Sequence, residues 1–278
     1  MIKTLISLDA NLASGIALKY ACQLANMIGM NLLPIHVETA DHERQPPGTG
    51  WVQQTWEKGL LETAQEEISR LIAVEKASCR ALGAPEITIG DREEVILREL
   101  VEGSYDLFIE GALYAFNSSS FHEKTQSKLY RVTPCPIIVA KNLVRLKKLA
   151  LLLEDEENPQ PLISKFLKIL KGAEVQVDLI HFRFQKTGQL RSEEGEEGGS
   201  VSDRKKSDEF LHAAEAMLEE KGQTPGECRL IHDTPTNIAD SLQDYGLVVS
   251  YIPYHAGKRS PHVKLLNRVA TAILLCRR

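Results

Sequence analysis

No stretch of this 278-residue sequence is apolar for long enough to cross a membrane. The longest apolar runs, at 149–153 and 272–276, are far shorter than the roughly 18 residues that a helical span needs. At the N-terminus, Lys3 and Asp9 bracket a short strand-like run instead of the apolar core of a signal peptide. We therefore expect a soluble, cytoplasmic protein with no membrane span.

Cysteine is scarce, and neither sign of charge dominates. The five cysteines are scattered, odd in number and without any CxxC spacing, which argues for reduced thiols and against a disulfide frame or a zinc site. The formal net charge of -5 gives no whole-protein reason to expect nucleic acid as the partner. With 43% hydrophobic and 26% charged residues, the chain has the composition of a globular protein.

The sequence also lacks the short motifs that mark common catalytic sites. It contains no GxxxxGK phosphate loop, no GxGxxG dinucleotide fingerprint, no GxSxG nucleophile turn and no HExxH metal motif. No enzymatic activity is supported by the residues, and no catalytic or metal-binding residue is assigned.

What the sequence does contain is an alternation of short apolar strands with amphipathic helical segments, the pattern of a parallel sheet covered by helices. The length predicts two domains. We predict strands over 2–8, 31–37, 86–89, 106–110 and 137–140, and again over 148–153, 175–184, 229–232, 247–252 and 272–276. Helices are predicted near 14–28, 52–82, 93–102 and 124–132, then near 161–170, 209–221, 237–243 and 262–269.

Residues at the strand ends recur at a fixed separation. Glu154 corresponds to Asp9 and His181 to His36, each 145 positions later. Further along, Arg268 corresponds to Arg131 at a shorter separation of 137 (268 − 131), as expected if the second copy has shorter late loops. We infer two copies of one domain, at 1–142 and 147–278, the second more degenerate. It carries an insertion at 185–207 that is rich in Gly, Glu, Lys and Ser and is predicted to be mobile.

These residues resemble the tandem universal stress proteins. The first copy resembles the family over nearly its whole length, whereas the second does so mainly through the repeat. The matching segments are the strand ending in Asp9, Ile35-His36-Val37-Glu38, Ile89-Gly90-Asp91, Tyr105-Asp106-Leu107-Phe108-Ile109-Glu110-Gly111 and Arg131-Val132-Thr133-Pro134-Cys135-Pro136-Ile137-Ile138-Val139. The resemblance implies an α/β fold of the adenine-nucleotide alpha-hydrolase-like type, with two doubly wound, five-stranded parallel sheets. It also implies that the copies pack through their last strands as an internal pseudo-dimer.

The resemblance further implies a nucleotide crevice at the carboxyl ends of the strands, as is general for open α/β sheets. Family members that bind ATP hold its adenosine end with an Asp after strand one and a residue after strand two. Asp9 and Val37 match these positions. In the second copy Glu154 replaces the Asp, and Tyr251 replaces the first glycine of the phosphate loop.

That phosphate loop follows the pattern Gly, two residues, Gly, nine residues, Gly and Ser or Thr. Gly111 matches its first glycine, but Tyr114 and Lys124 occupy the other two places, and Thr125 supplies the closing hydroxyl. One glycine of three remains, so no cofactor is certain and ATP is an option in the first domain alone.

Several polar groups allow two readings. Ser118 in the run 117–120, with Lys124 and Thr125, either cradles an anion or forms a polar loop that caps the next helix. Asp9 is either a ribose ligand or a helix cap. The cluster of His36 with residues 41–43 is either a metal site or, more in keeping with its spacing, a solvated surface. Six basic residues after position 253 suggest an anion- or RNA-facing surface, but charged helix faces are ordinary.

The sequence as a whole predicts a non-enzymatic stress-response protein that binds a partner protein or a small ligand. The alternative is an ATP-binding regulatory switch in the first-domain crevice, with slow or no hydrolysis. A third reading is a carrier of RNA or of a lipid-like ligand. A homodimer is an option, and nucleic acid is not the expected partner.

Overall fold

The computed structural model describes residues 1–39, 50–113, 118–154, 158–170, 172–185, 201–253 and 256–277. The chain divides into two compact units. One unit contains Met1–Ala115 and Gln126–Leu143, and the other contains Phe116–Thr125 and Val144–Arg278. The segment Phe116–Thr125 thus groups with the second unit, although the sequence places it in the first domain. We call the two units the first and second domain.

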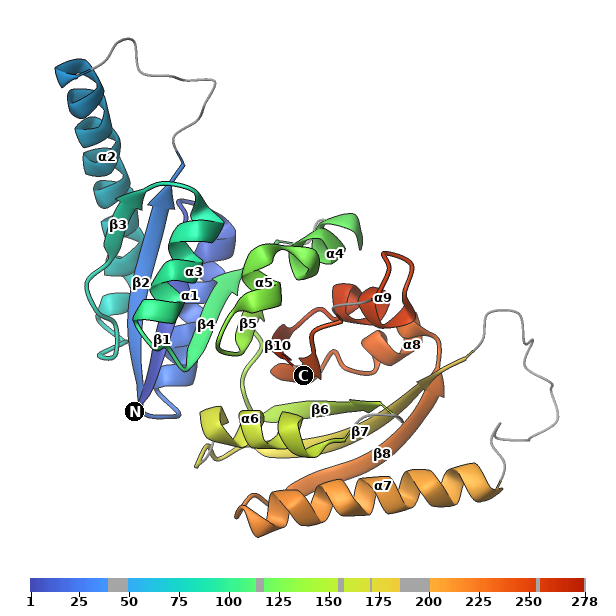
Figure 1. The fold of residues 1–278 in the computed structure, drawn as a ribbon. Coiled ribbons are helices and arrows are strands. Elements are labelled where there is room, and N and C mark those ends of the chain that lie inside the picture. Colours follow the sequence, from blue (N-terminus) through green and yellow to red (C-terminus); the bar gives the residue numbers. More distant parts are fainter. Residues whose placement is uncertain are drawn as a thin grey trace. The chain divides into compact units, whose positions relative to one another are not determined.

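The first domain is a five-stranded parallel sheet in the order β3-β2-β1-β4-β5. Helices α1 and α2 cover one face of the sheet, and α3 and α5 cover the other (Figure 1). Its elements are β1 (Ile2–Ser7), α1 (Leu12–Ala25), β2 (Met30–Glu38), α2 (Trp51–Lys76), β3 (Glu86–Ile89), α3 (Arg92–Glu102), β4 (Leu107–Gly111), α5 (Lys128–Val132) and β5 (Ile137–Ala140). Helix α4 (Ser118–Gln126) lies between β4 and α5 along the chain, and all but its last residue groups with the second unit.

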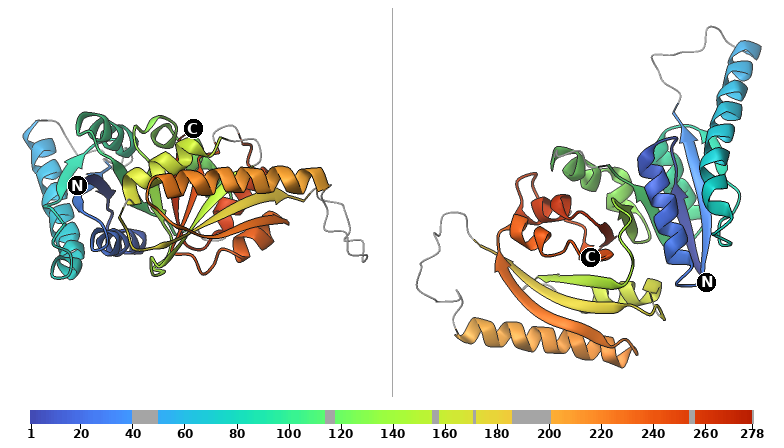
Figure 2. Two further views of the ribbon diagram at one scale, coloured as in Figure 1. Left: turned by 90° about the horizontal axis from the view of Figure 1, so that it is seen from below. Right: turned by 180° about the vertical axis from the view of Figure 1, so that it is seen from behind.

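The second domain repeats this order as β10-β9-β6-β7-β8, again with every strand parallel to its neighbour. Helices α6 and α7 lie on one face, and α8 and α9 on the other, which the views in Figure 2 make clear. The elements are β6 (Lys148–Glu154), α6 (Gln160–Leu170), β7 (Gln176–Phe184), α7 (Val201–Glu220), β8 (Pro225–Asp233), α8 (Pro235–Asp240), β9 (Leu247–Tyr251), α9 (Pro261–Arg268) and β10 (Ala272–Cys276).

Burial on both faces explains the composition of the inner strands. The strands of a parallel sheet that is covered by helices on both faces consist of continuous apolar sequence. Strands β5 and β10 fit this rule, because they are buried at every position. The predicted doubly wound α/β fold is therefore confirmed for each domain. The packing of the two domains through their last strands stays a prediction. No helix in the described ranges is long and apolar enough to cross a membrane.

Two predicted boundaries are wrong. Helix α7 begins at Val201, so the C-terminal part of the predicted mobile insertion is helical, and residues 186–200 of that insertion lie outside the described residues. The charged stretch 203–206 suits an exposed helix as well as a loop, and composition alone does not separate the two. The predicted helix at 124–132 is also two helices. Helix α4 already begins at Ser118 and ends at Gln126, and α5 begins after its N-cap residue Ser127.

The strand order fixes where a ligand can approach each sheet. In the first domain β1 lies between β2 and β4, so the chain winds outward in opposite directions from β1 and β4. The loops at their carboxyl ends diverge there, and open α/β sheets bind ligands at this switch point. In the second domain the same point lies between β6 and β9.

Candidate binding site at the carboxyl end of the first sheet

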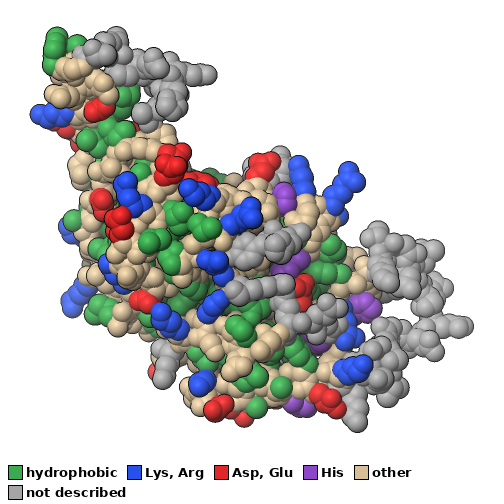
Figure 3. All heavy atoms as spheres, in the orientation of Figure 1, with side chains coloured by type: hydrophobic (Ala, Val, Ile, Leu, Met, Phe, Trp, Pro, Cys, Tyr) green, Lys and Arg blue, Asp and Glu red, His purple; other side chains and the backbone are tan. Residues whose placement is uncertain are grey.

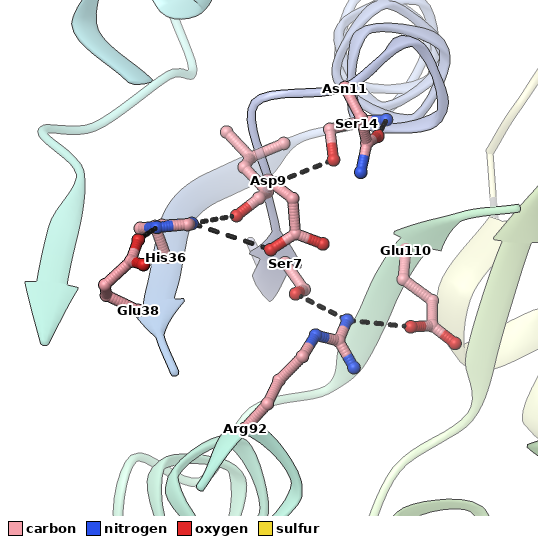
Figure 4. A network of polar contacts seen from close by, with 9 residues as sticks. Ser7, Asp9, Asn11, Ser14, His36, Glu38, Arg92 and Glu110 are labelled. Carbon is pink, nitrogen blue, oxygen red and sulfur yellow. Dashed lines mark hydrogen bonds and ion pairs between the residues drawn. The ribbon is translucent and has the colours of Figure 1, made fainter. Parts of the chain in front are cut away.

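A cluster of charged side chains occupies the switch point of the first domain (Figure 4). Asp9 follows β1, His36 and Glu38 come from the end of β2, and Glu110 comes from β4. Arg92 is the first residue of α3 and reaches across from the helix layer. We call these five residues the His36 cluster. They come together because the carboxyl ends of parallel strands meet at one edge of the sheet.

His36 is the centre of this cluster. Its Nδ1 lies 2.8 Å from the carbonyl oxygen of Leu8 and 3.5 Å from Oδ1 of Asp9, and its Nε2 lies 3.1 Å from Oε2 of Glu38. The Asp9 carboxylate, followed by the Leu8 carbonyl and Glu38, outweighs burial and raises the pKa of His36 to about 9. The imidazole is therefore an imidazolium at neutral pH, with both ring nitrogens as donors.

Arg92 makes a second ionic contact beside the first. Its guanidinium donates to Oγ of Ser7 at 2.8 Å and to Oε2 of Glu110 at 3.0 Å. Glu110 is buried, and its other oxygen accepts a hydrogen bond from the hydroxyl of Tyr130. Although burial opposes it, the Glu110 carboxylate keeps the pKa of Arg92 above its usual value. The Arg92 guanidinium and the buried Glu110 carboxylate therefore form an ion pair with each other.

The start of α1 decides between the two readings of Asp9. Asn11 is the N-cap of α1, because its side-chain oxygen accepts from the N–H of Ser14 at 2.9 Å. The backbone N–H of Asp9 donates to Oγ of Ser14 at 2.7 Å. The capping interpretation of Asp9 is therefore wrong. Its carboxylate instead faces His36, and its side chain stays 40% exposed.

The cluster as a whole presents acceptor oxygens to solvent. It contains three carboxylates against two cations, which leaves one negative charge in excess. The side chain of Glu38 is 32% exposed and that of Asp9 is 40% exposed, whereas His36 is nearly covered. A ligand at this edge of the sheet therefore meets carboxylate oxygens first. Hydroxyl and amino groups, which donate hydrogen bonds, suit such a surface.

The other residues that the sequence singled out have different surroundings. Val37 is buried in β2. Gly111 ends β4 where a Cβ would overlap the backbone of Ala13 in α1, so packing between a strand and a helix explains this glycine. The Thr125 hydroxyl is buried and donates to the carbonyl of His122 at 2.9 Å. Lys124 is partly exposed in α4.

Ser118, the remaining predicted ligand, begins α4, and its side chain lies outside the described residues. Residues 118–120, which the sequence reads as part of a loop, are therefore the first turn of a helix. Lys124 and Thr125 share this segment, which belongs to the second compact unit. The site is accordingly described from Asp9, Val37 and Gly111 and their neighbours in the first domain.

The proposed metal reading receives no support from the described residues. They contain no group of three or more His, Cys, Asp or Glu side chains placed to hold a metal ion. Residues 41–43, which the sequence groups with His36, lie outside the described ranges.

Four of the six basic residues after position 253 are exposed on α9 or in the loop before it, namely Lys258, Arg259, Lys264 and Arg268. Arg277 is exposed after β10, and residue 278 lies outside the described ranges. One of them, Arg268, pairs with Asp240 through Nε and Oδ1 at 3.3 Å. On the face that Figure 3 draws, acidic and basic side chains are intermixed over the described part of the surface. This mixture is ordinary for a solvated surface, and nucleic acid remains an unexpected partner.

The second domain holds its corresponding carboxylate in a different way. Oε1 of Glu154, at the end of β6, lies 3.2 Å from Nδ1 of His262 in α9, and Nε2 of His262 lies 3.0 Å from Oγ of Ser250 in β9. This connectivity is that of a hydrolase triad, but the Ser250 side chain is 1% exposed. Ile252 is the second residue after Ser250, and its N–H donates a hydrogen bond to the carbonyl oxygen of Cys276. The arrangement therefore buries the Ser250 hydroxyl and does not present it as a nucleophile, while the Glu154 side chain stays 27% exposed.

Sequence reasoning did not single out Glu110 and Arg92 as members of the His36 cluster. Glu110 stands alone in the otherwise apolar strand β4, and a single carboxylate in a buried strand is a signal that it needs a cation. Its partner Arg92 follows the N-cap Asp91 and looks like an ordinary first-turn residue. Only the fold brings α3 over the end of β4.

Comparison with known proteins gives a likeness of structure and none of sequence. No family model and no curated protein matches the sequence significantly. A universal stress protein from Archaeoglobus fulgidus is similar with a TM-score of 0.68 and 13% identity, covering 99% of this chain and 96% of that one. A protein of unknown function from Pseudomonas aeruginosa is similar with a TM-score of 0.61 and 13% identity, covering 99% and 92%.

The cytoplasmic domain of a prokaryotic cation chloride cotransporter is also similar, with a TM-score of 0.51 and 11% identity over 99% of this chain and 94% of that one. Identities this low establish the fold alone, and a fold does not fix an activity. The resemblance read from the strand ends is confirmed at that level. The chain has the tandem α/β fold of the universal stress proteins.

Proposed function

We propose that this chain is a non-enzymatic stress-response protein that acts by binding, and that its first domain binds a small ligand at the His36 cluster. One observation carries the proposal. The Asp9 carboxylate lies at the switch point of the sheet, is not used as a helix cap, and is held by His36 with 40% of its side chain exposed. An exposed charge oriented by a second charge is the kind of group that receives a ligand.

The chemistry of the ligand follows from the charges. Asp9 and Glu38 offer oxygen acceptors, and the two cations of the cluster already contact carboxylates. A ligand that donates hydrogen bonds fits this surface, and the hydroxyl groups of a ribose are the natural example. A ligand rich in negative charge does not fit it, because the cluster has a net negative charge of its own.

The ATP-binding switch remains the alternative, and the position of Asp9 favours it. The same carboxylate would receive the adenosine end of ATP. The phosphates, however, need hydrogen-bond donors, and two of the residues matched to the phosphate loop have other roles. Gly111 is required for packing against Ala13, and the Thr125 hydroxyl is bonded to His122. In this alternative Lys124, with Ser118, would have to contact the phosphates.

The absence of catalysis is part of the proposal and rests on the hydroxyl groups near the cluster. Ser7 accepts a hydrogen bond from Arg92, and Tyr130 donates to Glu110. Neither lies against a free base within the described cluster, so neither is activated as a nucleophile. A binding role, with either a small ligand or a partner protein that inserts a donor group, agrees better with these contacts.

The first experiment is to denature the purified protein and identify any released small molecule by mass spectrometry. Titration calorimetry with adenosine and with magnesium ATP then separates the two readings. The proposal expects adenosine, or a related hydroxyl-rich ligand, to bind at least as well as ATP. Much tighter binding of ATP, weakened by Lys124→Met, would instead favour the switch.

A matched pair of variants locates the site. Asp9→Asn keeps the shape of the side chain and removes its charge, and Glu154→Gln makes the same change at the corresponding place in the second domain. We expect Asp9→Asn to weaken binding roughly tenfold or more, because a charged hydrogen bond is lost, while Glu154→Gln leaves the affinity unchanged. Equal affinities of Asp9→Asn and the parent protein would refute the assignment.

A further inference from the structure

The second sheet ends in a long strand whose outer side is open. Strand β8 has nine residues and pairs with β7 along one side. Among the described residues no strand pairs with its other side, and β8 is the last in the strand order of its sheet (Figure 1). An edge strand of this length presents unpaired N–H and C=O groups that can pair with another chain.

The backbone contacts identify which groups face outward. The carbonyl of Asp233 accepts from the N–H of Gln185 at 3.1 Å, and the N–H of Glu227 donates to Oδ1 of Asp178 on β7 at 2.9 Å. Both residues thus point their backbone toward β7. Because successive residues of a strand alternate, the N–H and C=O groups of Cys228 and Leu230 point to the open side.

The side chains along this edge are exposed and chemically distinctive. All five cysteines of the chain are described, and Cys228 is the exposed one. Leu230 is 38% exposed, which is unusual for an apolar residue in a strand of this fold. Glu227 and Arg229 flank Cys228, with their side chains 58% and 38% exposed and 3.7 Å apart.

Glu227 and Arg229 already form an ion pair within the strand, and self-pairing in one register places a further opposite charge beside each of them. If two molecules pair their β8 strands antiparallel about Cys228, Glu227 of each lies opposite Arg229 of the other, twice over. A register centred on Arg229 would oppose two guanidinium groups, and one centred on Leu230 would oppose Glu227 to Asp233. Opposite charges across an antiparallel pair stabilise it and like charges destabilise it. The sequence of β8 therefore permits the pairing about Cys228 and disfavours its neighbours.

We propose that β8 is a self-association surface, at which a second molecule of this chain adds its own β8 antiparallel about Cys228. Such a contact is isologous, so one two-fold axis closes the dimer and pairs both open edges at once. The occupant is a copy of this chain because the strand complements itself in charge. This surface is independent of the His36 cluster and of the ligand proposed for it.

The exposed thiol provides the first test. Opposite residues in a hydrogen-bonded antiparallel pair have Cα atoms about 5.5 Å apart, within the range that a disulfide spans. Oxidised glutathione would accept two electrons from two Cys228 thiols, which lose two protons, and would leave as two reduced molecules. Burial and the neighbouring Glu215 raise the pKa of the Cys228 thiol, so the reaction is best run at about pH 8.5.

We expect a covalent dimer on a non-reducing gel, with Cys228 joined to Cys228 in the peptide map, and none for Cys228→Ser. A chain that stays uncrosslinked under these conditions while it self-associates in solution would place the interface elsewhere and overturn the proposal. A chain that sediments as a monomer at high concentration would overturn it as well.

Charge reversal gives a test that does not depend on the thiol. In a Cys228→Ser background, Glu227→Arg and Arg229→Glu each turn two attractive pairs into two repulsive ones, and each should raise the dimer dissociation constant roughly tenfold or more. The double exchange restores opposite charges and should restore the dimer. Glu227 also lies 3.8 Å from Lys148, and Arg229 donates to the hydroxyl of Tyr245, so thermal melting is followed in parallel. Single exchanges that fold but leave the dimer unchanged would refute the register.

Discussion

Alkaline titration of His36 should remove a definable part of the stability of the first domain. The pKa of His36 is about 9 in the folded chain, against an ordinary value of 6.5. Because the folded state holds this proton more tightly than the unfolded state, the contribution is complete below pH 6.5. It decreases as the pH rises and is lost above about pH 9.

The size of the effect follows from the shift in pKa. Each unit corresponds to about 1.4 kcal/mol, so the protonated His36 contributes at most about 3 kcal/mol to the free energy of unfolding. Solvent lowers this limit, since the Asp9 and Glu38 side chains that hold the proton are 40% and 32% exposed. Even half of it is large beside the 5–15 kcal/mol or so that stabilises a typical domain.

The assay is urea unfolding of the parent chain and of His36→Gln between pH 6 and about pH 10. Both tryptophans of the sequence, Trp51 and Trp56, lie in α2, so their fluorescence reports the first domain. The difference between the two chains cancels every other group that titrates in this range. It should be largest near pH 6 and should shrink by about 1–3 kcal/mol toward pH 9.5.

A difference that stays constant from pH 6.5 to pH 9 would refute the reasoning, because His36 would then be neutral in both states. Following the His36 ring protons by NMR over the same range gives the midpoint directly and requires no unfolding.

Three further perturbations test the surroundings of the cluster. Arg92→Met should destabilise the first domain by about 3–5 kcal/mol in urea unfolding, because it leaves the buried Glu110 carboxylate without its cation, and a loss under 1 kcal/mol would contradict this. Gly111→Ala should lower the melting temperature, since a Cβ there overlaps the backbone of Ala13; an unchanged melting temperature would show that α1 moves freely. Cys22 should resist iodoacetamide at pH 8 in the folded chain and react in urea, because burial raises the pKa of its thiol far above the usual value; modification of the folded chain, seen by peptide mass mapping, would be the contrary result.

The order of elements was predictable because each strand and helix carries its own local pattern. Apolar runs such as 137–140 and 272–276 are buried at every position in β5 and β10, as a sheet covered on both faces requires. The boundaries of α7 and α4 were not predictable in the same way. Their first turns are polar and charged, and such residues form exposed helices and loops about equally well.

The site was predictable only where its residues end strands. Asp9 and His36 could be placed near one another because both follow from the register of parallel strands. The contact between Arg92 and Glu110 depends instead on how α3 packs over β4, and no local pattern in the sequence encodes that distance. At Gly111 the sequence led to the wrong function instead of missing a residue. The motif suggests that this glycine binds a phosphate, whereas the structure shows that a side chain here would overlap the backbone of Ala13.

The two domains differ most at the carboxylate that follows their first strand. In the first domain His36 holds Asp9 from a neighbouring strand, from the side, and leaves the carboxylate open to solvent. In the second domain His262 holds Glu154 from α9, a helix that follows β9, and joins it to the buried Ser250. The histidine contact therefore leaves the Asp9 side chain 40% exposed, against 27% for that of Glu154, and it joins only Glu154 to a buried hydroxyl. This difference is the reason to expect a ligand in the first domain, and to expect the second domain to contribute a surface such as β8.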